Sequence, residues 1–206
     1  DNGDIDGICR AVPGSISPIL GEGGINQSQV ILTMYEDDGE PFLMDPRQVL
    51  ARVLDAFMVS GFSPRIAIEL EFSLFNRPRG EQSLREALPA PEQIGGNLYG
   101  LSALDDRTEL FSAVQKGFAI QSLPYEGVLK ESAPAQYEIN VSYSDDAIVY
   151  CDQITRMQRG LRSISSRFDA QVSFMPKPIE DQAGNGMHIH CSLLDESGKN
   201  LFDSKN

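Results

Sequence analysis

Residues 65–75 constrain the fold more than any other stretch, because large apolar residues occupy every second position from Ile66 to Leu74. Successive side chains of a β-strand point to opposite faces of its sheet, so this pattern predicts a strand with one apolar face. Glu69 and Glu71 then lie side by side on the other face. The stretch therefore predicts a strand that gives apolar residues to a core and two carboxylates to a polar surface.

These two carboxylates have two interpretations. Neighbouring glutamates repel one another, and exposure to solvent would relieve that repulsion. A divalent cation shared between Glu69 and Glu71 would relieve it more completely. The strand by itself leaves both interpretations open.

The only two histidines of the chain, His188 and His190, lie in a second alternating stretch. In an extended strand both point to one face, together with Gly186 and Ser192. The glycines before the strand suit a tight turn or a close approach of the backbone to a ligand. Taken alone, the stretch could equally be a half-buried strand with two polar residues on its wet face. The intervening residues are predicted to face an apolar layer: Met187, Ile189, Cys191 and Leu193.

The rest of the chain predicts an α+β fold, in which several strands are interleaved with helices. The first helix has Asp45 as its N-cap and Pro46 at its first position. An apolar stripe from Val49 to Met58 indicates that this helix packs in the core. Helices are expected at 46–60, 102–121 and 145–168, further strands at 5–12, 30–35, 127–131, 136–141 and 171–175, and a loop at 76–100.

Composition restricts the function classes and the compartment. The formal net charge of −13 argues against a nucleic-acid partner. No apolar run is long enough for a membrane span, and no charged-then-apolar leader is present, which argues against a membrane protein. Three scattered cysteines indicate reduced thiols and a cytoplasmic protein. The chain begins without Met and stops at Asn206 in a polar stretch, so we expect an excerpt of something longer.

Acidic residues on separate strands predict a cation site. If these strands are neighbours, so many carboxylates without a counter-charge would be costly to place together. Oxygen-rich ligation suits Mg²⁺ or Mn²⁺, and one imidazole is compatible with Mn²⁺ especially. No P-loop pattern is present, so an ATP site would have to be built from metal ligands. The residues concerned are Glu69, Glu71, Glu131, Glu138 and His188.

Four motifs, in this order and spacing, resemble the glutamine synthetase family. They are Glu-x-Glu-Phe at 69–72, Lys-Glu-x-x-x-x-Gln-Tyr-Glu-Ile-Asn at 130–140, Phe-Met-Pro-Lys-Pro at 174–178 and Gly-x-Gly-Met-His-x-His-x-Ser at 184–192. Asp45-Pro46-Arg47 also fits. The Gln-Tyr-Glu-Ile-Asn form is most similar to the γ-glutamylpolyamine (γ-glutamylputrescine) synthetase branch.

The resemblance implies a fold and a reaction. Residues 1–45 would be a partial β-grasp-like segment, and residues 46–206 the N-terminal part of a catalytic domain with a curved antiparallel sheet and helices. ATP would phosphorylate the γ-carboxylate of glutamate, and ammonia or a primary amine would displace phosphate from the γ-glutamyl phosphate. The family also implies a ring-shaped homo-oligomer with active sites between neighbouring subunits.

The resemblance carries metal ligands over, position by position. Glu71, Glu131 and Glu138 match the ligands of a first divalent cation, either Mg²⁺ or Mn²⁺. Glu69 and His188 match two ligands of a second cation, which lies toward the transferred phosphoryl group.

Four further positions match contacts to substrates. His190 and Ser192 match positions on the ATP phosphates, and Gly184 matches the backbone that lies against glutamate. Tyr99 matches an aromatic residue near the incoming amine. No catalytic acid, base or nucleophile is assigned within this chain.

Departures from the family pattern affect the substrate and the completeness of the site. Ala183 stands where ammonia-using members commonly carry an Asn that contacts glutamate. The N-terminal segment lacks the family's ammonium-site motif, which favours an amine acceptor. The third ligand of the second metal and the substrate-binding arginines are expected after Asn206, so this chain alone is expected to be inactive.

Two other functions stay open from the sequence. One is a catalytically inactive, glutamine-synthetase-like protein with a structural or regulatory role. Retention of all five expected metal ligands argues against it. The other is a simple metal-dependent hydrolase.

Overall fold

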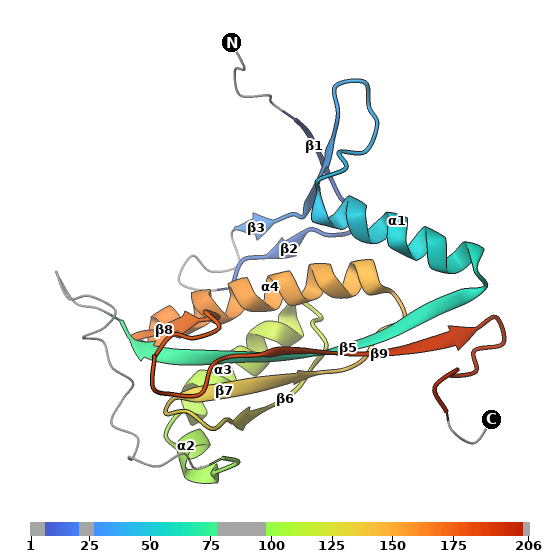
Figure 1. Cartoon of the computed structure of the whole chain (residues 1–206). Coiled ribbons are helices and arrows are strands. Elements are labelled where there is room, and N and C mark those ends of the chain that lie inside the picture. The colour runs from blue at the N-terminus through green and yellow to red at the C-terminus, as the bar shows by residue number, and fades with distance from the viewer. Residues whose placement is uncertain (1–6, 21–26, 78–97, 204–206) are drawn as a thin grey trace.

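A five-stranded antiparallel sheet forms the centre of the computed structural model, which describes residues 7–20, 27–77 and 98–203 (Figure 1). With its helices, this sheet confirms the predicted α+β class. The strand order is β6-β7-β5-β8, and β9 also pairs with β5. The strands are β5 (Phe62–Asn76), β6 (Tyr125–Lys130), β7 (Gln136–Val141), β8 (Ala170–Ser173) and β9 (Met187–Asp195).

The long strand β5 is the axis of the sheet. Its residues 69–73 pair with β7 along one edge, while residues 62–70 pair with β9 and residues 73–76 with β8 along the other. The alternation in its sequence has the predicted effect, because one face of the strand is apolar and buried. The buried residues of that face are Ile68, Leu70, Phe72 and Leu74.

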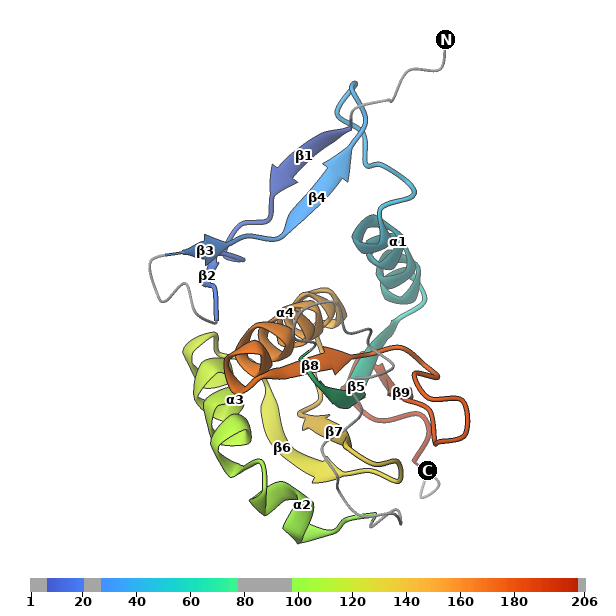
Figure 2. The ribbon, with the colours of Figure 1, turned by 90° about the vertical axis from the view of Figure 1, so that its left-hand side faces the viewer.

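Helices α3 (Thr108–Ile120) and α4 (Ala147–Ser165) cover this apolar face (Figure 2). In α4, the hydroxyl of the fully buried Tyr150 accepts a hydrogen bond of 3.0 Å from the backbone N–H of Ile68. This bond ties the helix layer to β5. None of the helices in the described ranges is both long and apolar enough to cross a bilayer. The inward residues of the two helices are Leu110, Phe111, Val114, Phe118, Ile154, Met157, Leu161 and Ile164.

The N-terminal part of the chain forms two small antiparallel pairs outside the main sheet (Figure 2). Strand β1 (Ile8–Ala11) pairs with β4 (Leu32–Tyr35), and β2 (Ser17–Pro18) pairs with β3 (Ser28–Gln29). Strands are therefore present within both expected ranges, 5–12 and 30–35, although the second begins only at Leu32 and residues 5–6 lie outside the described residues. The assignment of residues 1–45 to a partial β-grasp-like segment stays a prediction.

Asp45 connects this part to helix α1 (Pro46–Val59). Its Oδ1 accepts a hydrogen bond of 3.0 Å from the N–H of Arg47, which caps the helix as predicted. Its Oδ2 accepts bonds from the hydroxyl of Thr33, at 2.7 Å, and from the N–H of Met34, at 2.8 Å. One buried carboxylate therefore fixes the helix start against β4.

The helix predicted at 102–121 is two helices, α2 (Leu101–Asp105) and α3. Arg107 leaves helical geometry with φ −120° and ψ 16°. The hydroxyl of Thr108 donates a hydrogen bond of 2.8 Å to the carbonyl of Asp105. In a continuous helix this carbonyl would instead accept a hydrogen bond from a backbone N–H of the next turn. The helix predicted to reach residue 168 likewise ends as α-helix at Ser165 and continues as a 3₁₀ turn.

Two apolar faces that were predicted to be buried are exposed within the described residues. Helix α1 contributes no buried residue, and Val53 and Met58 of its stripe are 47% and 70% exposed. On β9, Met187 and Ile189 are 51% and 58% exposed. Periodicity shows which residues share a face, but it does not show what covers that face. In the described ranges, α3 and α4 cover other parts of the sheet.

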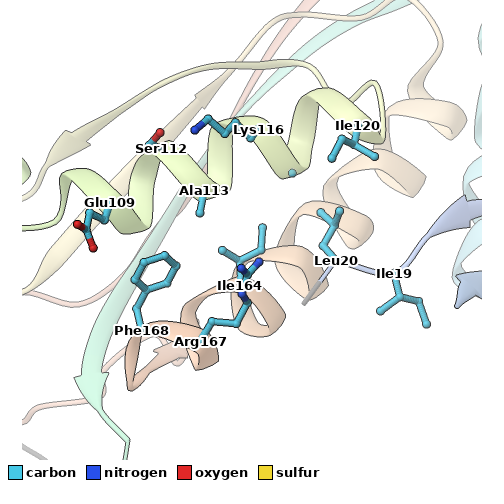
Figure 3. A pocket seen from close by; sticks show the side chains of 11 residues that line it. Ile19, Leu20, Glu109, Ser112, Ala113, Lys116, Ile120, Ile164, Arg167 and Phe168 are labelled. Atoms are coloured by element: carbon cyan, nitrogen blue, oxygen red, sulfur yellow. The ribbon is translucent and has the colours of Figure 1, made fainter. Parts of the chain in front are cut away.

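Leu20 lies between α3 and α4 and lines one end of a cavity, whose wall also includes Lys116 and Phe168 (Figure 3). Two glycines make room for it. A Cβ at Gly117 would lie 3.2 Å from a methyl carbon of Leu20, and a Cβ at Gly160 would lie equally close to the same atom. This cavity is on the helix-covered side of the sheet, opposite the predicted metal ligands.

Candidate metal centre

The antiparallel register brings predicted ligands onto one face of the sheet. Glu69 of β5 lies opposite His188 of β9, and Glu71 of β5 lies opposite Glu138 of β7. Residues directly opposite in an antiparallel pair point to the same face, with Cβ atoms about 5 Å apart. Four ligand candidates from three adjacent strands therefore converge.

Glu69 lies between the two histidines. Nδ1 of His188 is 3.0 Å from Oε2 of Glu69, and Nε2 of His190 is 2.9 Å from Oε1 of the same carboxylate. The prediction that both imidazoles point to one face is therefore confirmed. A neutral imidazole can donate its N–H to a carboxylate and keep its other nitrogen as a metal ligand.

Glu71 is set more deeply and is only 8% exposed. Its Oε2 accepts two hydrogen bonds, at 2.9 Å from the N–H of Gly186 and at 3.1 Å from the side-chain amide of Gln136. Its Oε1 lies 3.7 Å from Nδ1 of His188. One oxygen is thus held by protein donors, while the other faces the cluster.

Glu138 shows how concentrated the negative charge is. Burial, followed by the charges of Glu69, Glu131 and Glu71, raises the pKa of Glu138 to about 7, while His188 lowers it. The carboxylates are therefore close enough to act on one another electrostatically. Such a cluster favours a bound cation, because a cation stabilises the ionised form of every member.

Glu131 and Tyr99 are both fixed at the end of β6. The N–H of Glu131 donates to the carbonyl of Gln136, and the N–H of Tyr99 donates to the carbonyl of Lys130, each at 2.9 Å. Tyr99 has a positive φ of 61°, and its side chain is largely exposed. The structure therefore places Tyr99 beside the strand end that carries Glu131.

The turn before β9 passes very close to the segment that follows β8. A Cβ at Gly184 would lie 2.2 Å from the carbonyl oxygen of Pro176, so a residue with a side chain does not fit this backbone path. The N–H of Asn185 donates to the same carbonyl at 2.8 Å. Farther along β9, Oγ of Ser192 accepts a bond of 3.3 Å from the side chain of Asn200. Gly184 and Ser192 thus lie at opposite ends of the stretch that carries the two histidines.

The donor set fits a hard divalent cation. Glu69, Glu138 and His188 each offer a ligand atom, and these atoms lie within 4.8 Å of one another. Carboxylate oxygens with an imidazole nitrogen suit Mg²⁺ or Mn²⁺. Gly186 leaves room for this arrangement, because a Cβ there would lie only 2.9 Å from Oε1 of Glu71.

Two polar residues that hold the cluster together were not identified from the sequence, Gln136 and Asn185. Gln136 belongs to the motif at 130–140, and alternation in β7 places it on the same face as Glu138, but neither signal indicates its contact with Glu71. Asn185 had no signal, because its partners come from β5, from β7 and from the segment after β8. Its Oδ1 accepts a bond from the hydroxyl of Ser73, and its Nδ2 donates to the carbonyl of Met175.

Comparison with known proteins agrees with the motifs. Residues 43–206 match the family model described as the glutamine synthetase catalytic domain. The chain belongs to the glutamine synthetase family. The γ-glutamylputrescine synthetase PuuA of Escherichia coli (strain K12) is 32% identical over 204 residues, which cover 97% of this chain and 43% of PuuA. Glutamate–isopropylamine ligase of a Pseudomonas species is 27% identical over 176 residues, which cover 85% of this chain and 38% of that enzyme.

Solved structures share the fold. A GmaS/ADP complex matches with a TM-score of 0.85 and 25% identity, over 100% of this chain and 46% of the other. The glutamine synthetase of Plasmodium falciparum, determined by cryoEM, matches with a TM-score of 0.82 and 18% identity, over 100% of this chain and 44% of the other. The second match supports the fold alone.

These matches confirm the family that the four motifs indicated. They also show that the chain spans less than half the length of the curated relatives it matches. The relatives are named as ligases or synthetases, and these names support the assignment of this chain to a ligase enzyme.

Proposed function

We propose that the protein is an ATP-dependent ligase that joins the γ-carboxylate of glutamate to ammonia or a primary amine through γ-glutamyl phosphate, using two divalent cations. The observation that carries this proposal is the convergence of Glu69, Glu138 and His188, with Glu71 beside them, on one sheet face in a chain of this family. Relatives named γ-glutamylputrescine synthetase and glutamate–isopropylamine ligase support an amine as acceptor, and relatives named glutamine synthetase support ammonia.

The cation assignments follow the family pattern. Glu71, Glu131 and Glu138 would hold one Mg²⁺ or Mn²⁺, and Glu69 and His188 would contribute to the other. Bound there, the cations would neutralise negative charge on the phosphate oxygens of ATP. The deep position and double anchoring of Glu71 support its role as a fixed ligand.

The remaining residues are proposed to position the substrates. His190 and Ser192 follow His188 on the same face of β9 and are proposed to contact the phosphates of ATP. The backbone at Gly184, which passes against Pro176, is proposed to lie against glutamate. Tyr99 is proposed to lie beside the incoming amine. Holding the γ-carboxylate next to the γ-phosphate removes much of the entropic cost of bringing the two reactants together.

The test measures ADP release by the full-length protein with ATP, Mn²⁺ and glutamate. Separate reactions contain ammonia, putrescine, ethanolamine or no amine, and mass spectrometry identifies the γ-glutamyl product. We expect ADP release to require glutamate, to rise with at least one of these nitrogen donors, and to match product formation.

Two results would contradict the proposal. ADP release that glutamate and amines leave unchanged would indicate a metal-dependent hydrolase. A protein that binds Mn²⁺ and releases no ADP under any of these conditions would favour the non-catalytic alternative.

A further inference from the structure

Gln136 is the most completely buried polar side chain near the metal centre, at 1% exposed. It begins β7, two residues before Glu138, and so points to the ligand face. Its amide makes four hydrogen bonds to protein groups. A buried amide with this many partners is fixed in one orientation.

The partners of Gln136 define which end of its amide faces which group. Its Oε1 accepts a bond of 2.9 Å from the backbone N–H of Ala133, in the bend between β6 and β7. Its Nε2 faces three acceptors: Oε2 of Glu71 at 3.1 Å, the carbonyl of Gly184 at 2.8 Å and Oδ1 of Asn185 at 3.2 Å. Because an amide nitrogen has two hydrogens, the three acceptors share them, and a flipped amide would place an oxygen against all three.

At Glu71 this contact determines which oxygen is free. Oε2 receives hydrogen bonds from Gln136 and Gly186, so its lone pairs are used. Oε1 is left to face the cluster, where Nδ1 of His188 is 3.7 Å away. Without Gln136, the carboxylate loses one of the two donors that hold this orientation.

At the turn before β9, the same amide binds backbone and side chain together. Gly184 contributes its carbonyl and Asn185 its side-chain oxygen. Asn185 in turn accepts from the hydroxyl of Ser73 on β5 and donates to the carbonyl of Met175. The bend after β6, the middle of β5 and the turn before β9 therefore meet at one buried side chain.

We propose that Gln136 is a positioning residue for the cation at Glu71. It fixes the carboxylate rotamer and, through Gly184 and Asn185, the distance between that carboxylate and the turn before β9. This inference rests on the proposed function only in requiring a cation at Glu71. It does not depend on which acceptor is used or on turnover.

A purely structural role for Gln136 predicts something different. Loss of a buried hydrogen-bonding amide would then lower the free energy of unfolding and leave the cation affinity of the folded protein unchanged. Groups that orient metal ligands behave otherwise, since their loss typically weakens metal binding by about 10- to 100-fold. The two roles can therefore be separated by measuring binding to folded protein.

The experiment compares Gln136→Met with Gln121→Met in the full-length protein. Gln121 is also buried, and its amide nitrogen donates to the carbonyl of Pro18 on the helix-covered side, far from the ligand face. Methionine keeps the length of the side chain and removes the amide in both cases. Free Mn²⁺ is followed by electron paramagnetic resonance during a titration without nucleotide, and urea unfolding measures stability.

We expect Gln136→Met to raise the Kd for Mn²⁺ by about tenfold or more, while Gln121→Met stays within about twofold of the unchanged protein. Equal Kd values for all three proteins, or equal weakening in both variants, would overturn the inference. If Gln136→Met does not fold, Gln136→Asn takes its place. Its shorter amide should also weaken Mn²⁺ binding, and an unchanged Kd would again overturn the inference.

Failure of this inference is distinct from failure of the proposed function. An unchanged protein that binds no Mn²⁺ would overturn both. A protein whose Mn²⁺ affinity depends on Gln136, but whose ADP release no amine stimulates, would overturn the proposed function and support the role of Gln136.

Discussion

The backbone N–H of Gly186 donates a hydrogen bond of 2.9 Å to Oε2 of Glu71 and joins the turn before β9 to the middle of β5. The same glycine leaves space for the other carboxylate oxygen, since a Cβ would lie 2.9 Å from Oε1. Gly186 therefore supplies both a donor to Glu71 and the room for its free oxygen to face the cluster.

Substitution of Gly186 by Ala should displace the Glu71 carboxylate, because the added methyl group and Oε1 cannot both keep their positions. The displaced carboxylate would strain its hydrogen bonds from Gly186 and Gln136, and its free oxygen would no longer face the cluster, so the change should weaken cation binding. We expect the Kd for Mn²⁺ to rise by about tenfold. Gly127→Ala is the matched control, since a Cβ there meets no atom within 4 Å. Equal Kd values in the two variants would contradict the role assigned to Gly186.

Substitution of Glu71 by Gln should weaken Mn²⁺ binding more strongly. The donors from Gly186 and Gln136 will select the amide oxygen of the new side chain, which turns its NH₂ group toward the cation. We expect a rise in Kd of at least about tenfold, because the change removes a ligand oxygen as well as its charge. The exposed Glu126→Gln on β6 removes the same charge away from the ligand face. Calorimetric titrations that coincide for both variants would remove Glu71 from the ligand set.

Some of this centre could be predicted from alternation alone. A two-residue period predicts that Glu69 and Glu71 share one face of their strand, and that His188 and His190 share one face of another. The structure adds the antiparallel register that places Glu69 against both imidazoles. Register depends on pairing between distant segments, so a single sequence carries little information about it.

Other features were beyond sequence reasoning for physical reasons. Gln136 touches Glu71 and Gly184, which are 65 and 48 residues away, and no local pattern encodes such contacts. Burial of an apolar face also depends on a partner. The stripe of α1 and the apolar side of β9 have the predicted periodicity, yet both are open within the described residues.

The lowered pKa of the Asp45 carboxyl group predicts that the stability of the fold depends on pH. Burial acts to raise its pKa, but hydrogen bonds from Met34, Thr33 and Arg47 outweigh burial and hold the pKa below its ordinary value. A carboxyl group whose pKa is lower in the folded state stabilises the fold above its unfolded pKa, which is about 4. This stabilisation is lost as the pH falls through the lower, folded-state pKa.

Asp45→Asn should therefore be less stable than the unchanged protein at pH 7, by about 1–3 kcal/mol. Asn can still cap the helix through its side-chain oxygen, but its NH₂ group then replaces the oxygen that accepts hydrogen bonds from Thr33 and Met34, and the charge is lost as well. The difference should shrink as the pH falls below about 4. Urea unfolding at several pH values measures it, with Asp55→Asn on the exposed side of the same helix as the control. A difference that is the same at every pH would show that the charge of Asp45 does not stabilise the fold.

Gly160 separates what sequence propensity predicts from what packing predicts. In the middle of α4, replacing Gly by Ala should stabilise a free helix by about 1 kcal/mol. In this fold the added Cβ would lie 3.0 Å from Cε1 of the fully buried Phe118 and 3.2 Å from a methyl carbon of Leu20. Overpacking of a core costs about 1–3 kcal/mol, so we expect a net loss of stability for Gly160→Ala. Thr155→Ala, at an exposed position of α4, should instead gain a few tenths of a kcal/mol. A gain in both variants on urea unfolding would mean that Phe118 and Leu20 pack loosely against α4.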